Sequence, residues 1–408
     1  MVLSALRNGP PCKKFVYWFS ELPLKKSGRI SNLTQTKGKN MKRKIGFKSL
    51  LAGTVCAMLL LIQPSADACT ALHLTAKDGG VVVGRTMEFG LDTKSDAVIV
   101  PAKSRLTSSL PDKSQGIQYT TKYGFVGLNF MEKRMVVDGM NEKGMYVGAL
   151  YLPGYADYQK GTPENAAKSM APEDYVAWLL GNFASVAEVK ANYDKVILVQ
   201  NPQKEIGGQS FPGHFLITDD SGAAIVIEPI NKTLKLYENP IGILTNSPGF
   251  DWHMINLSNY ANLSAVNVKP LDFSNTTIKT FGQGSGLVGL PGDYTPPSRF
   301  VRAVVFSQSA IKLPTAAETV FQMFHIMNAF DIPFGSIQEK TKDAIHYDYT
   351  QWTTVADLKN KKYAFKTYSD QSIRSIDLRK ALAAAGNGIK VIEMDSKQPV
   401  EDVSLKFK

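Results

Sequence analysis

Cysteine and histidine are scarce in this sequence. Its 408 residues include three cysteines and five histidines. The histidines are His73, His214, His253, His325 and His346. No two of them follow the His-x-x-x-His spacing of a metal-binding helix, so we expect no zinc or other metal site. The low cysteine count also argues against a scaffold held together by disulfide bonds.

Long apolar runs are absent as well. The run from Leu50 to Ile62 has about a dozen residues, whereas a membrane-spanning helix needs about 20. It follows the basic Lys42–Lys44 and precedes a small-x-small site that ends at Ala68, an order typical of a secretory signal peptide. We therefore predict a signal peptide over residues 41–68. Residues 1–40 are interpreted as an N-terminal extension or a start-site artefact, with no fold assigned.

A strong excess of positive charge is absent once this leader is set aside. Residues 1–68 carry 12 Lys and Arg against 2 Asp and Glu, which accounts for +10 of the chain's net charge of +11. The remaining 340 residues are therefore close to neutral. They give no indication of binding nucleic acid or an anionic membrane, and we expect no stable membrane insertion after cleavage. At that length they can bury a sizeable core.

Removal of the leader would leave Cys69 as the first residue and the only thiol. Three explanations of a lone cysteine in an exported protein stay open: chance, a lipid attachment site, or a nucleophile. A cysteine in first position carries both a thiol and a free α-amino group. With an ordinary pKa of about 7.7–8.0, that amine can accept the thiol proton near neutral pH. The thiol can then attack an amide and form a thioester, which water hydrolyses.

The sequence after Cys69 alternates between strand-like and helix-like patterns. Two short apolar segments flank the turn residues Lys77–Gly80. They predict a hairpin that brings Arg85 back toward Cys69. Helices are predicted over residues 171–183, 186–192, 251–260, 298–311 and 315–330. Strands are predicted over residues 69–75, 81–87, 97–101, 122–128, 134–138, 145–151, 196–199, 214–218, 223–228, 235–237, 241–245, 345–355, 362–368 and 372–378. We find no repeat and no linker, so residues 69–408 are predicted to form a single α+β domain of two packed sheets with helices outside.

Four polar side chains could assist a nucleophilic Cys69. Arg85 and Glu88 follow it by 16 and 19 residues: a cation near the thiol lowers its pKa, and a carboxylate could hold the amine or the arginine. A surface ion pair explains the same spacing, so both interpretations stay open. Asn246 ends an apolar strand before a turn, where its amide could face a site or serve the turn alone. Arg299 opens a helix, where a cation opposes the dipole, which indicates a role elsewhere.

Five separated blocks of sequence occur in an order and at a spacing that point to one known family. They are Cys69–Ala71, Gly84–Phe89, Asp138–Gly144, Leu244–Pro248 with Phe250–His253, and Gly289–Phe300. These blocks resemble the choloylglycine hydrolase family, which comprises conjugated bile salt hydrolases and penicillin V acylases, and the resemblance covers residues 69–408. It implies an N-terminal-nucleophile hydrolase with a four-layer αββα sandwich. Such an enzyme cleaves a linear carbon–nitrogen amide bond without a cofactor.

The resemblance also implies a role for each candidate residue. Cys69 matches the family's nucleophile, and Arg85 and Arg299 match its active-site arginines. Asn246 matches the side chain of the oxyanion hole, and Tyr151 stands where a backbone N–H supplies the other donor. Glu88 stands where most members have Asp, which is one methylene shorter, so we expect the role to be kept with a changed geometry.

The resemblance leaves the substrate open among several small amides. Tyr151 stands where bile salt hydrolases usually have Asn and penicillin V acylases have Tyr, which favours penicillin V-like acyl amides over conjugated bile salts. N-acyl homoserine lactones fit as an alternative, because they also pair an apolar acyl group with a small polar amine. The signal peptide would place the enzyme in a bacterial periplasm or outside the cell. Relatives are commonly tetramers, so we expect a homo-oligomer.

Two other classes of protein compete with this hypothesis. The small-x-small site before Cys69 faintly resembles a lipid-attachment box, in which the acylated cysteine would tether a binding lipoprotein to a membrane. Asp67 and the absence of Leu at position 66 argue against it. An inactive scaffold that keeps the fold for binding alone is the other competitor. Intact mass tests the lipoprotein, because lipidation adds a diacylglyceryl group to Cys69.

Overall fold

The computed structural model of the protein describes residues 68–111, 114–133, 135–341 and 344–406. The predicted extension over residues 1–40, and the predicted signal peptide apart from Ala68, lie outside the described residues. In the part of the chain that the structure describes, no helix is both long and apolar enough to cross a membrane. Two antiparallel sheets share one hydrophobic core there.

The first sheet is built around the predicted hairpin at the start of the domain. Its strands run in the order β14-β1-β2-β18-β19-β20, and β17 pairs with β18 outside that path. The strands are β1 (Cys69–Thr75), β2 (Val81–Phe89), β14 (Ile243–Leu244), β17 (Ile337–Lys340), β18 (Ile345–Asp357), β19 (Lys362–Thr367) and β20 (Arg374–Asp377). Because β1 lies between β2 and β14, the strand that starts at Cys69 has a neighbour on each side.

The second sheet contains eight strands in the order β13-β12-β11-β8-β7-β6-β3-β21. They are β3 (Ala97–Val100), β6 (Phe125–Asn129), β7 (Val136–Asn141), β8 (Tyr146–Tyr151), β11 (Gly213–Thr218), β12 (Ala224–Ile230), β13 (Thr233–Glu238) and β21 (Lys390–Ile392). Among the small pairs outside both large sheets are β4 (Arg105–Ser109) with β5 (Gln115–Thr120), and β9 (Ser169–Met170) with β10 (Ile197–Leu198). The central strands β7, β8 and β11 are buried along their whole length, as strands covered on both faces must be.

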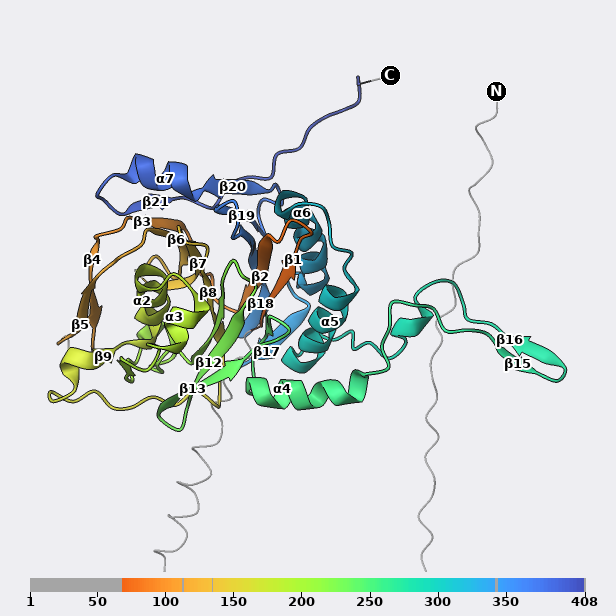
Figure 1. The fold of residues 1–408 in the computed structure, drawn as a ribbon, viewed down its shortest axis with the longest axis horizontal. Coiled ribbons are helices and arrows are strands. Elements are labelled where there is room, and N and C mark those ends of the chain that lie inside the picture. The colour runs from red at the N-terminus through yellow and green to blue at the C-terminus, as the bar shows by residue number, and fades with distance from the viewer. Residues whose placement is uncertain (1–67, 112–113, 134, 342–343, 407–408) are drawn as a thin grey trace, which may run out of the picture. The chain divides into compact units, whose positions relative to one another are not determined.

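Helices cover the outer face of each large sheet (Figure 1). On the first sheet, α6 packs against β2 and β18 and α5 packs against β1, whereas α2 packs against β7 and β8 of the second sheet. The helices are α2 (Tyr175–Asn182), α3 (Val186–Lys190), α4 (Phe250–Asn256), α5 (Pro296–Ser309), α6 (Ala316–Met327) and α7 (Leu378–Ala385). Thr315 and Glu318 form a capping box that starts α6. The result is the predicted four-layer αββα sandwich.

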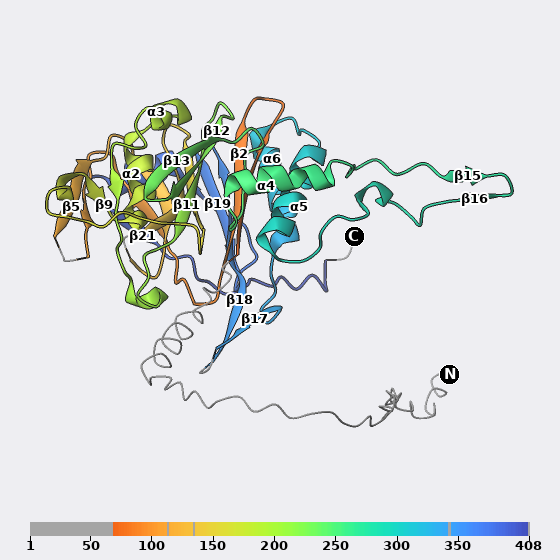
Figure 2. The ribbon, with the colours of Figure 1, turned by 90° about the horizontal axis from the view of Figure 1, so that it is seen from below.

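Residues 261–291 form an extension that carries the small hairpin of β15 (Leu271–Phe273) and β16 (Thr276–Ile278) (Figure 2). Both strands are exposed along their whole length. The large apolar side chains exposed on the extension are Val266, Val268, Leu271, Phe273, Ile278, Phe281 and Val288. Such a concentration of exposed apolar groups is typical of an interaction surface.

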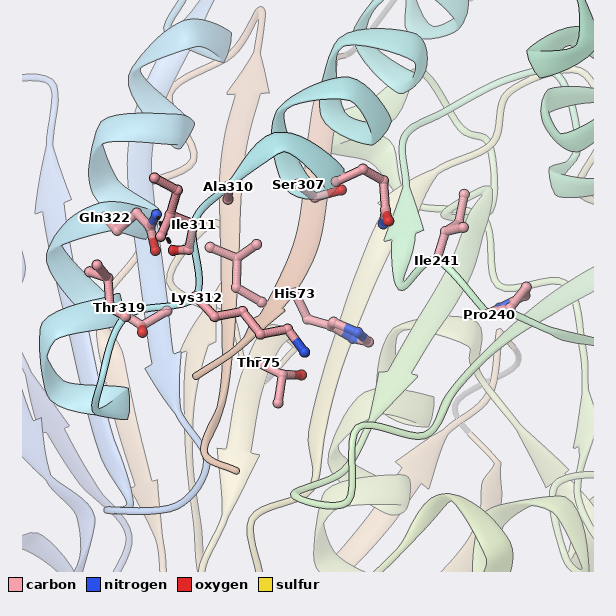
Figure 3. A pocket seen from close by; sticks show the side chains of 13 residues that line it. His73, Thr75, Pro240, Ile241, Ser307, Ala310, Ile311, Lys312, Thr319 and Gln322 are labelled. Atoms are coloured by element: carbon pink, nitrogen blue, oxygen red, sulfur yellow. Dashed lines mark hydrogen bonds between the residues drawn. The ribbon is translucent and has the colours of Figure 1, made fainter. Parts of the chain in front are cut away.

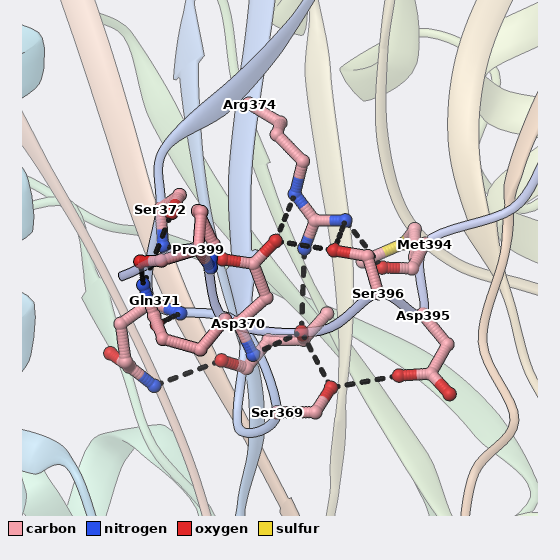
Figure 4. Close-up of polar contacts among 11 residues, drawn as sticks. Ser369, Asp370, Gln371, Ser372, Arg374, Met394, Asp395, Ser396 and Pro399 are labelled. Carbon is pink, nitrogen blue, oxygen red and sulfur yellow. Dashed lines mark hydrogen bonds and ion pairs between the residues drawn. The ribbon is translucent and has the colours of Figure 1, made fainter. Parts of the chain in front are cut away.

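The C-terminal segment is held against the connection between β19 and β20 by polar contacts (Figure 4). Arg374 lies 3.5 Å from the carboxylate of Asp370 and donates a hydrogen bond to the carbonyl of Met394 at 2.7 Å. Ser369 donates to the carboxylate of Asp395 at 2.8 Å. These bonds fix the chain after β21 in place.

Candidate active site

Cys69 is the first residue of β1 and is only 3% exposed. Its register partner in β2 is Met87, whose Sδ lies 3.8 Å from Cys69 Sγ. Arg85 lies two residues before Met87 and therefore on the same face of β2, and its Nη2 is 3.8 Å from the same sulfur. The hairpin register thus brings Arg85 next to the thiol.

Arg85 is fully buried, and the second sheet holds its guanidinium. It donates hydrogen bonds to the carbonyls of Val137 and of Ala149, the latter at 2.5 Å. Its Nη1 lies 3.4 Å from Asp138 Oδ2, and the Trp352 ring lies 5.3 Å from the guanidinium carbon. The charge partner of Arg85 is therefore Asp138 on β7, so the alternative of a surface ion pair with Glu88 is wrong.

Asn246 and Arg299 meet at the backbone of Cys69. Asn246 Oδ1 accepts from the Cys69 nitrogen at 2.7 Å and from Arg299 Nη2 at 2.7 Å, while its Nδ2 donates to the carbonyl of Tyr151 at 2.8 Å. Arg299 also donates to the carbonyl of Cys69 and to Thr70 Oγ1, the latter at 2.8 Å. The arginine that begins α5 therefore fixes the start of β1. One hydrogen of Asn246 Nδ2 remains available to a ligand, because an amide nitrogen carries two.

Glu88 lies beside the peptide bond between Ala68 and Cys69. Its backbone N–H donates to the carbonyl of Ala68 at 2.9 Å. Its carboxylate is buried: Oε1 accepts from Thr350 at 3.2 Å, and Oε2 has no hydrogen-bond partner among the described residues. Burial raises the pKa of Glu88 to about 7, and the positive charge of Arg299 opposes that rise. Because side chains alternate along a strand, the carboxylate lies on the face of β2 opposite to Arg85 and Met87.

Four aromatic rings line the cavity at the thiol: those of Phe89, Phe130, Tyr151 and Phe211. The ring centroids of Phe89 and Phe130, of Phe89 and Tyr151, and of Tyr151 and Phe211 are 5.2, 5.7 and 5.6 Å apart, each pair in an edge-to-face arrangement. The cavity they leave at Cys69 has a volume of about 10 Å³, the space of about one water molecule. A larger cavity of about 280 Å³ shares Phe130 and Phe211 with it. The two cavities therefore adjoin at these two rings.

The thiol of Cys69 does not ionise readily in this environment. Burial raises its pKa above the ordinary value of 9.0, and the negative charge of Glu88 adds to that rise. The positive charges of Arg85 and Arg299 act in the opposite direction without overcoming burial. The thiol is therefore protonated at neutral pH and needs a base before it can attack a carbonyl.

The structure brings all six predicted site residues to one place: Cys69, Arg85, Glu88, Tyr151, Asn246 and Arg299. Sequence reasoning missed Met87, although the i, i+2 spacing from Arg85 in a strand would have indicated it. It also missed Asp138, which begins a sequence block that was noted only for the family resemblance. It also missed the buried histidines His214 and His253, which contact the backbone around Asn246. His214 reaches its partner from a distant strand, whereas His253 lies only seven residues after Asn246.

A second hollow lies at the far end of β1 and contains none of the predicted residues (Figure 3). It has a volume of about 240 Å³ and is lined by residues of β1, α5 and α6, among them His73, Ser307 and Gln322. Cys69 does not line it. Among the described residues, no group of three or more His, Cys, Asp or Glu side chains could hold a metal ion.

Known proteins are similar to this chain in sequence and in fold. Residues 69–393 match the family described as linear amide C–N hydrolases, choloylglycine hydrolase family. The chain is 33% identical to bile salt hydrolase/transferase from Clostridium perfringens, over 82% of this chain and 100% of that protein. It is 32% identical to bile salt hydrolase/transferase from Lactiplantibacillus plantarum, over 76% of this chain and 92% of that protein.

Solved structures agree with these relatives. A mutant of conjugated bile acid hydrolase from Clostridium perfringens superposes with a TM-score of 0.71 at 32% identity, over 82% of this chain and 99% of that chain. Penicillin V acylase from Agrobacterium tumefaciens has the same fold, with a TM-score of 0.63 at 23% identity, over 80% of this chain and 91% of that chain. The fold and the sequence together define a hydrolase that acts on linear amide C–N bonds. The chain belongs to the choloylglycine hydrolase family.

Proposed function

We propose that this protein is an exported amidase that uses Cys69, exposed as the first residue, as its nucleophile. The observation that carries the proposal is the convergence of three elements on one residue. Cys69 Sγ faces Arg85, and the Cys69 nitrogen is 2.7 Å from Asn246 Oδ1, which Arg299 also binds at 2.7 Å. These groups come from β1, β2, the segment after β14, and α5, so the fold assembles them.

The base in this proposal is the α-amino group that forms when residues 1–68 are removed. In the uncut chain the Cys69 nitrogen belongs to a peptide bond and cannot accept a proton. The raised pKa of the thiol makes a nearby base necessary, and an α-amine has a suitable ordinary pKa of about 7.7–8.0. The buried Glu88 Oε2, which lacks a partner in the described structure, is suited to hold the new ammonium group.

The reaction proceeds in two balanced steps. The sulfur forms a bond to the amide carbon, the thiol proton passes through the α-amine to the leaving nitrogen, and the carbon–nitrogen bond breaks to release the amine. Water then attacks the thioester and releases the acid and the free thiol. Asn246 Nδ2 and the backbone N–H of Tyr151 stabilise the oxyanion in both steps. Arg85 contacts the sulfur of Cys69, and Arg299 binds the backbone of Cys69 and the side chain of Asn246, so the two arginines hold the nucleophile and Asn246 in position.

The proposed substrate is an amide of the conjugated bile salt or penicillin V type. The names of the relatives at 33% and 32% identity support bile salts, whereas Tyr151 supports penicillin V. The aromatic lining at Cys69 and the adjoining cavity of about 280 Å³ suit a bulky apolar acyl group. N-acyl homoserine lactones are the alternative substrate.

Cleavage after Ala68 by signal peptidase, with export to a bacterial periplasm or beyond, is part of this proposal. The competing lipoprotein requires a diacylglyceryl group on Cys69 Sγ. The fold buries Cys69, whereas a cysteine that anchors a protein to a membrane must be exposed. Burial of Cys69 therefore supports the amidase.

We propose further that the protein is a homo-oligomer, such as a tetramer, held by the extension over residues 261–291. Its exposed apolar side chains, including Phe273 and Phe281, support association with a second copy of the chain. Light scattering after size-exclusion chromatography tests this. The parent protein should have a multiple of the chain mass, and Phe281→Asp should lower it. A monomeric parent would contradict the proposal.

The function is tested by incubating the processed protein with glycocholate, penicillin V and a long-chain acyl homoserine lactone. At least one amide should be hydrolysed, and kcat/KM ranks the three. Cys69→Ala should abolish turnover and keep the melting temperature, whereas Lys94→Ala, a change at an exposed lysine, should keep full turnover. Substantial activity in folded Cys69→Ala would rule out the mechanism.

A further inference from the structure

Asn246 lies in a short segment that no sheet ladder holds. The pairing of β14 with β1 ends at Leu244, and α4 does not begin until Phe250. The peptide planes on both sides of Asn246 must therefore be fixed by other bonds. An oxyanion donor needs such fixation, because a displacement of about 1 Å can reduce a rate by about a hundredfold.

The first such bond comes from the second sheet. His214 on β11 places Nε2 2.9 Å from the carbonyl of Thr245, the residue before Asn246. On the other side of the ring, His214 Nδ1 lies 3.0 Å from Glu228 Oε1 on β12. The same carboxylate oxygen accepts from the backbone N–H of Phe250 at 2.9 Å. One buried pair, His214 with Glu228, thus binds the segment around Asn246 at both of its ends.

The second bond comes from α4. His253 reaches back from the first turns of this helix and places Nε2 2.9 Å from the carbonyl of Asn246 itself. Its ring stacks on Phe300 of α5, with centroids 4.6 Å apart and planes at 15°. Burial lowers the pKa of His253 to about 4, so the ring is neutral at neutral pH. Since a carbonyl oxygen can only accept, the hydrogen of the neutral ring is on Nε2.

Both carbonyls that flank the Asn246 side chain are therefore held by fully buried histidines. Neither histidine hydrogen-bonds Cys69 in the described structure. Burial of two histidines and a carboxylate opposes folding unless hydrogen bonds compensate for the lost solvent. Glu228 Oε2 and His253 Nδ1 have no partner among the described residues, so the bonds to the Asn246 segment are the main ones that these groups make. Their hydrogen bonds converge on one segment of the backbone. This convergence indicates that the orientation of Asn246 has to be fixed.

We propose that His214, together with Glu228, and His253 are positioning residues that hold Asn246 in the orientation needed to stabilise the oxyanion. The inference rests on the proposed function, because it assigns Asn246 the oxyanion role. It predicts that loss of either histidine lowers the rate of the chemical step. Substrate binding and the reactivity of the thiol remain as in the parent protein.

The test is a double-mutant cycle on the processed enzyme with the best substrate of the panel. His253→Leu should lower kcat by about tenfold to a hundredfold and change KM by less than about threefold. His253→Gln, which keeps a donor, should recover part of the loss. In an Asn246→Ala background, His253→Leu should change kcat by less than about twofold, because the group it positions is gone. His214→Gln in the same two backgrounds gives an independent second cycle.

Two controls separate positioning from general damage. His325→Leu removes an exposed histidine on α6 and should leave kcat unchanged. The rate at which iodoacetamide alkylates Cys69 should be the same in His253→Leu and the parent. A loss of kcat that persists fully in the Asn246→Ala background, or a parallel loss of alkylation rate, would overturn the inference. Activity in Cys69→Ala would instead overturn the proposed function, so the two failures are distinguishable.

Discussion

Asp138 is the acidic partner of the buried guanidinium of Arg85. Its carboxylate accepts hydrogen bonds from the hydroxyls of Tyr146, Tyr363 and Thr354, the last at 3.2 Å, and lies 3.4 Å from Arg85 Nη1. Every member of this network is buried. Removal of the negative charge would leave a buried guanidinium without its counterion, which is among the most destabilising single changes in a protein.

We therefore predict that Asp138→Asn lowers the free energy of unfolding by about 3 kcal/mol. Urea denaturation at pH 7 measures it. The matched control is Glu205→Gln, which breaks the exposed ion pair with Lys133 and should have little effect. Equal denaturation midpoints for Asp138→Asn and the parent would show that Arg85 does not need this counterion.

His253 gives a prediction about pH. Its pKa is about 4 in the folded protein and about 6.5 in an unfolded chain. Between these values the unfolded chain binds a proton that the folded protein does not, so protonation favours unfolding as the pH falls from about 6.5 to 4. The Gln of His253→Gln does not titrate. The stability advantage of the parent over this variant should therefore shrink by about 3 kcal/mol between pH 7 and pH 4. Urea denaturation at several pH values measures the difference, and a difference that stays constant would contradict the lowered pKa.

At the residue scale, the sequence could predict which site residues lie close together when they are also close in the chain. Cys69 and Arg85 are neighbours because a hairpin joins them, and the hairpin could be predicted from its turn. Family resemblance was needed for Asn246, Arg299 and Tyr151, since each reaches Cys69 from a distant segment. Asp138 and His214 could not be found in this way, because their roles arise only when the two sheets pack. His253 lies seven residues after Asn246, but its bond to that carbonyl depends on how α4 turns back on the segment.

The contact between α6 and β2 depends on the absence of a side chain at Gly84. A Cβ atom there would lie 2.5 Å from Met323 Cγ and 2.6 Å from Met323 Sδ. Gly84 lies one residue before Arg85, so the helix approaches β2 closely behind the site. A larger residue would push α6 away or force Met323 into another rotamer.

We predict that Gly84→Ala destabilises the protein by about 1–2 kcal/mol, because the added methyl group overpacks this contact. Gly292→Ala is the matched control: a Cβ atom at Gly292 meets nothing within 4 Å, and its φ angle is not in the left-handed region. The shift in the urea midpoint measures both variants. Equal midpoints for the two would show that α6 accommodates the methyl group freely.

At the element scale, each predicted strand and helix has a counterpart in the structure, with ends displaced by a few residues. The missed elements are short, exposed or edge strands and one late helix: β4, β5, β9, β15, β16, β17, β21 and α7. Strands β15 and β16 bury neither face, so they lack the alternation by which a strand is recognised. The helix α7 directly follows β20, and its first residue, Leu378, had been assigned to that strand.

For the whole molecule, the αββα class could be predicted, but the strand orders could not. The sequence does not indicate that β18, which lies more than 250 residues after β2, pairs with it. Local patterns contain no information about such distant pairings. The family resemblance supplied the four-layer class but no strand order.

The proposed mechanism requires that the peptide bond between Ala68 and Cys69 is cleaved. Ala68 is 3% exposed, and its carbonyl accepts from the backbone N–H of Glu88 at 2.9 Å. The bond between Ala68 and Cys69 is thus packed inside the fold when it is uncut, where an external peptidase cannot easily reach it. Cleavage by signal peptidase would therefore have to precede folding.

The most direct test is the N-terminal sequence and intact mass of the purified, active protein. The account predicts that the active chain begins at Cys69, with an unmodified α-amino group and no lipid. A chain that hydrolyses its amide substrate at the full rate while retaining residues before Cys69 would contradict it.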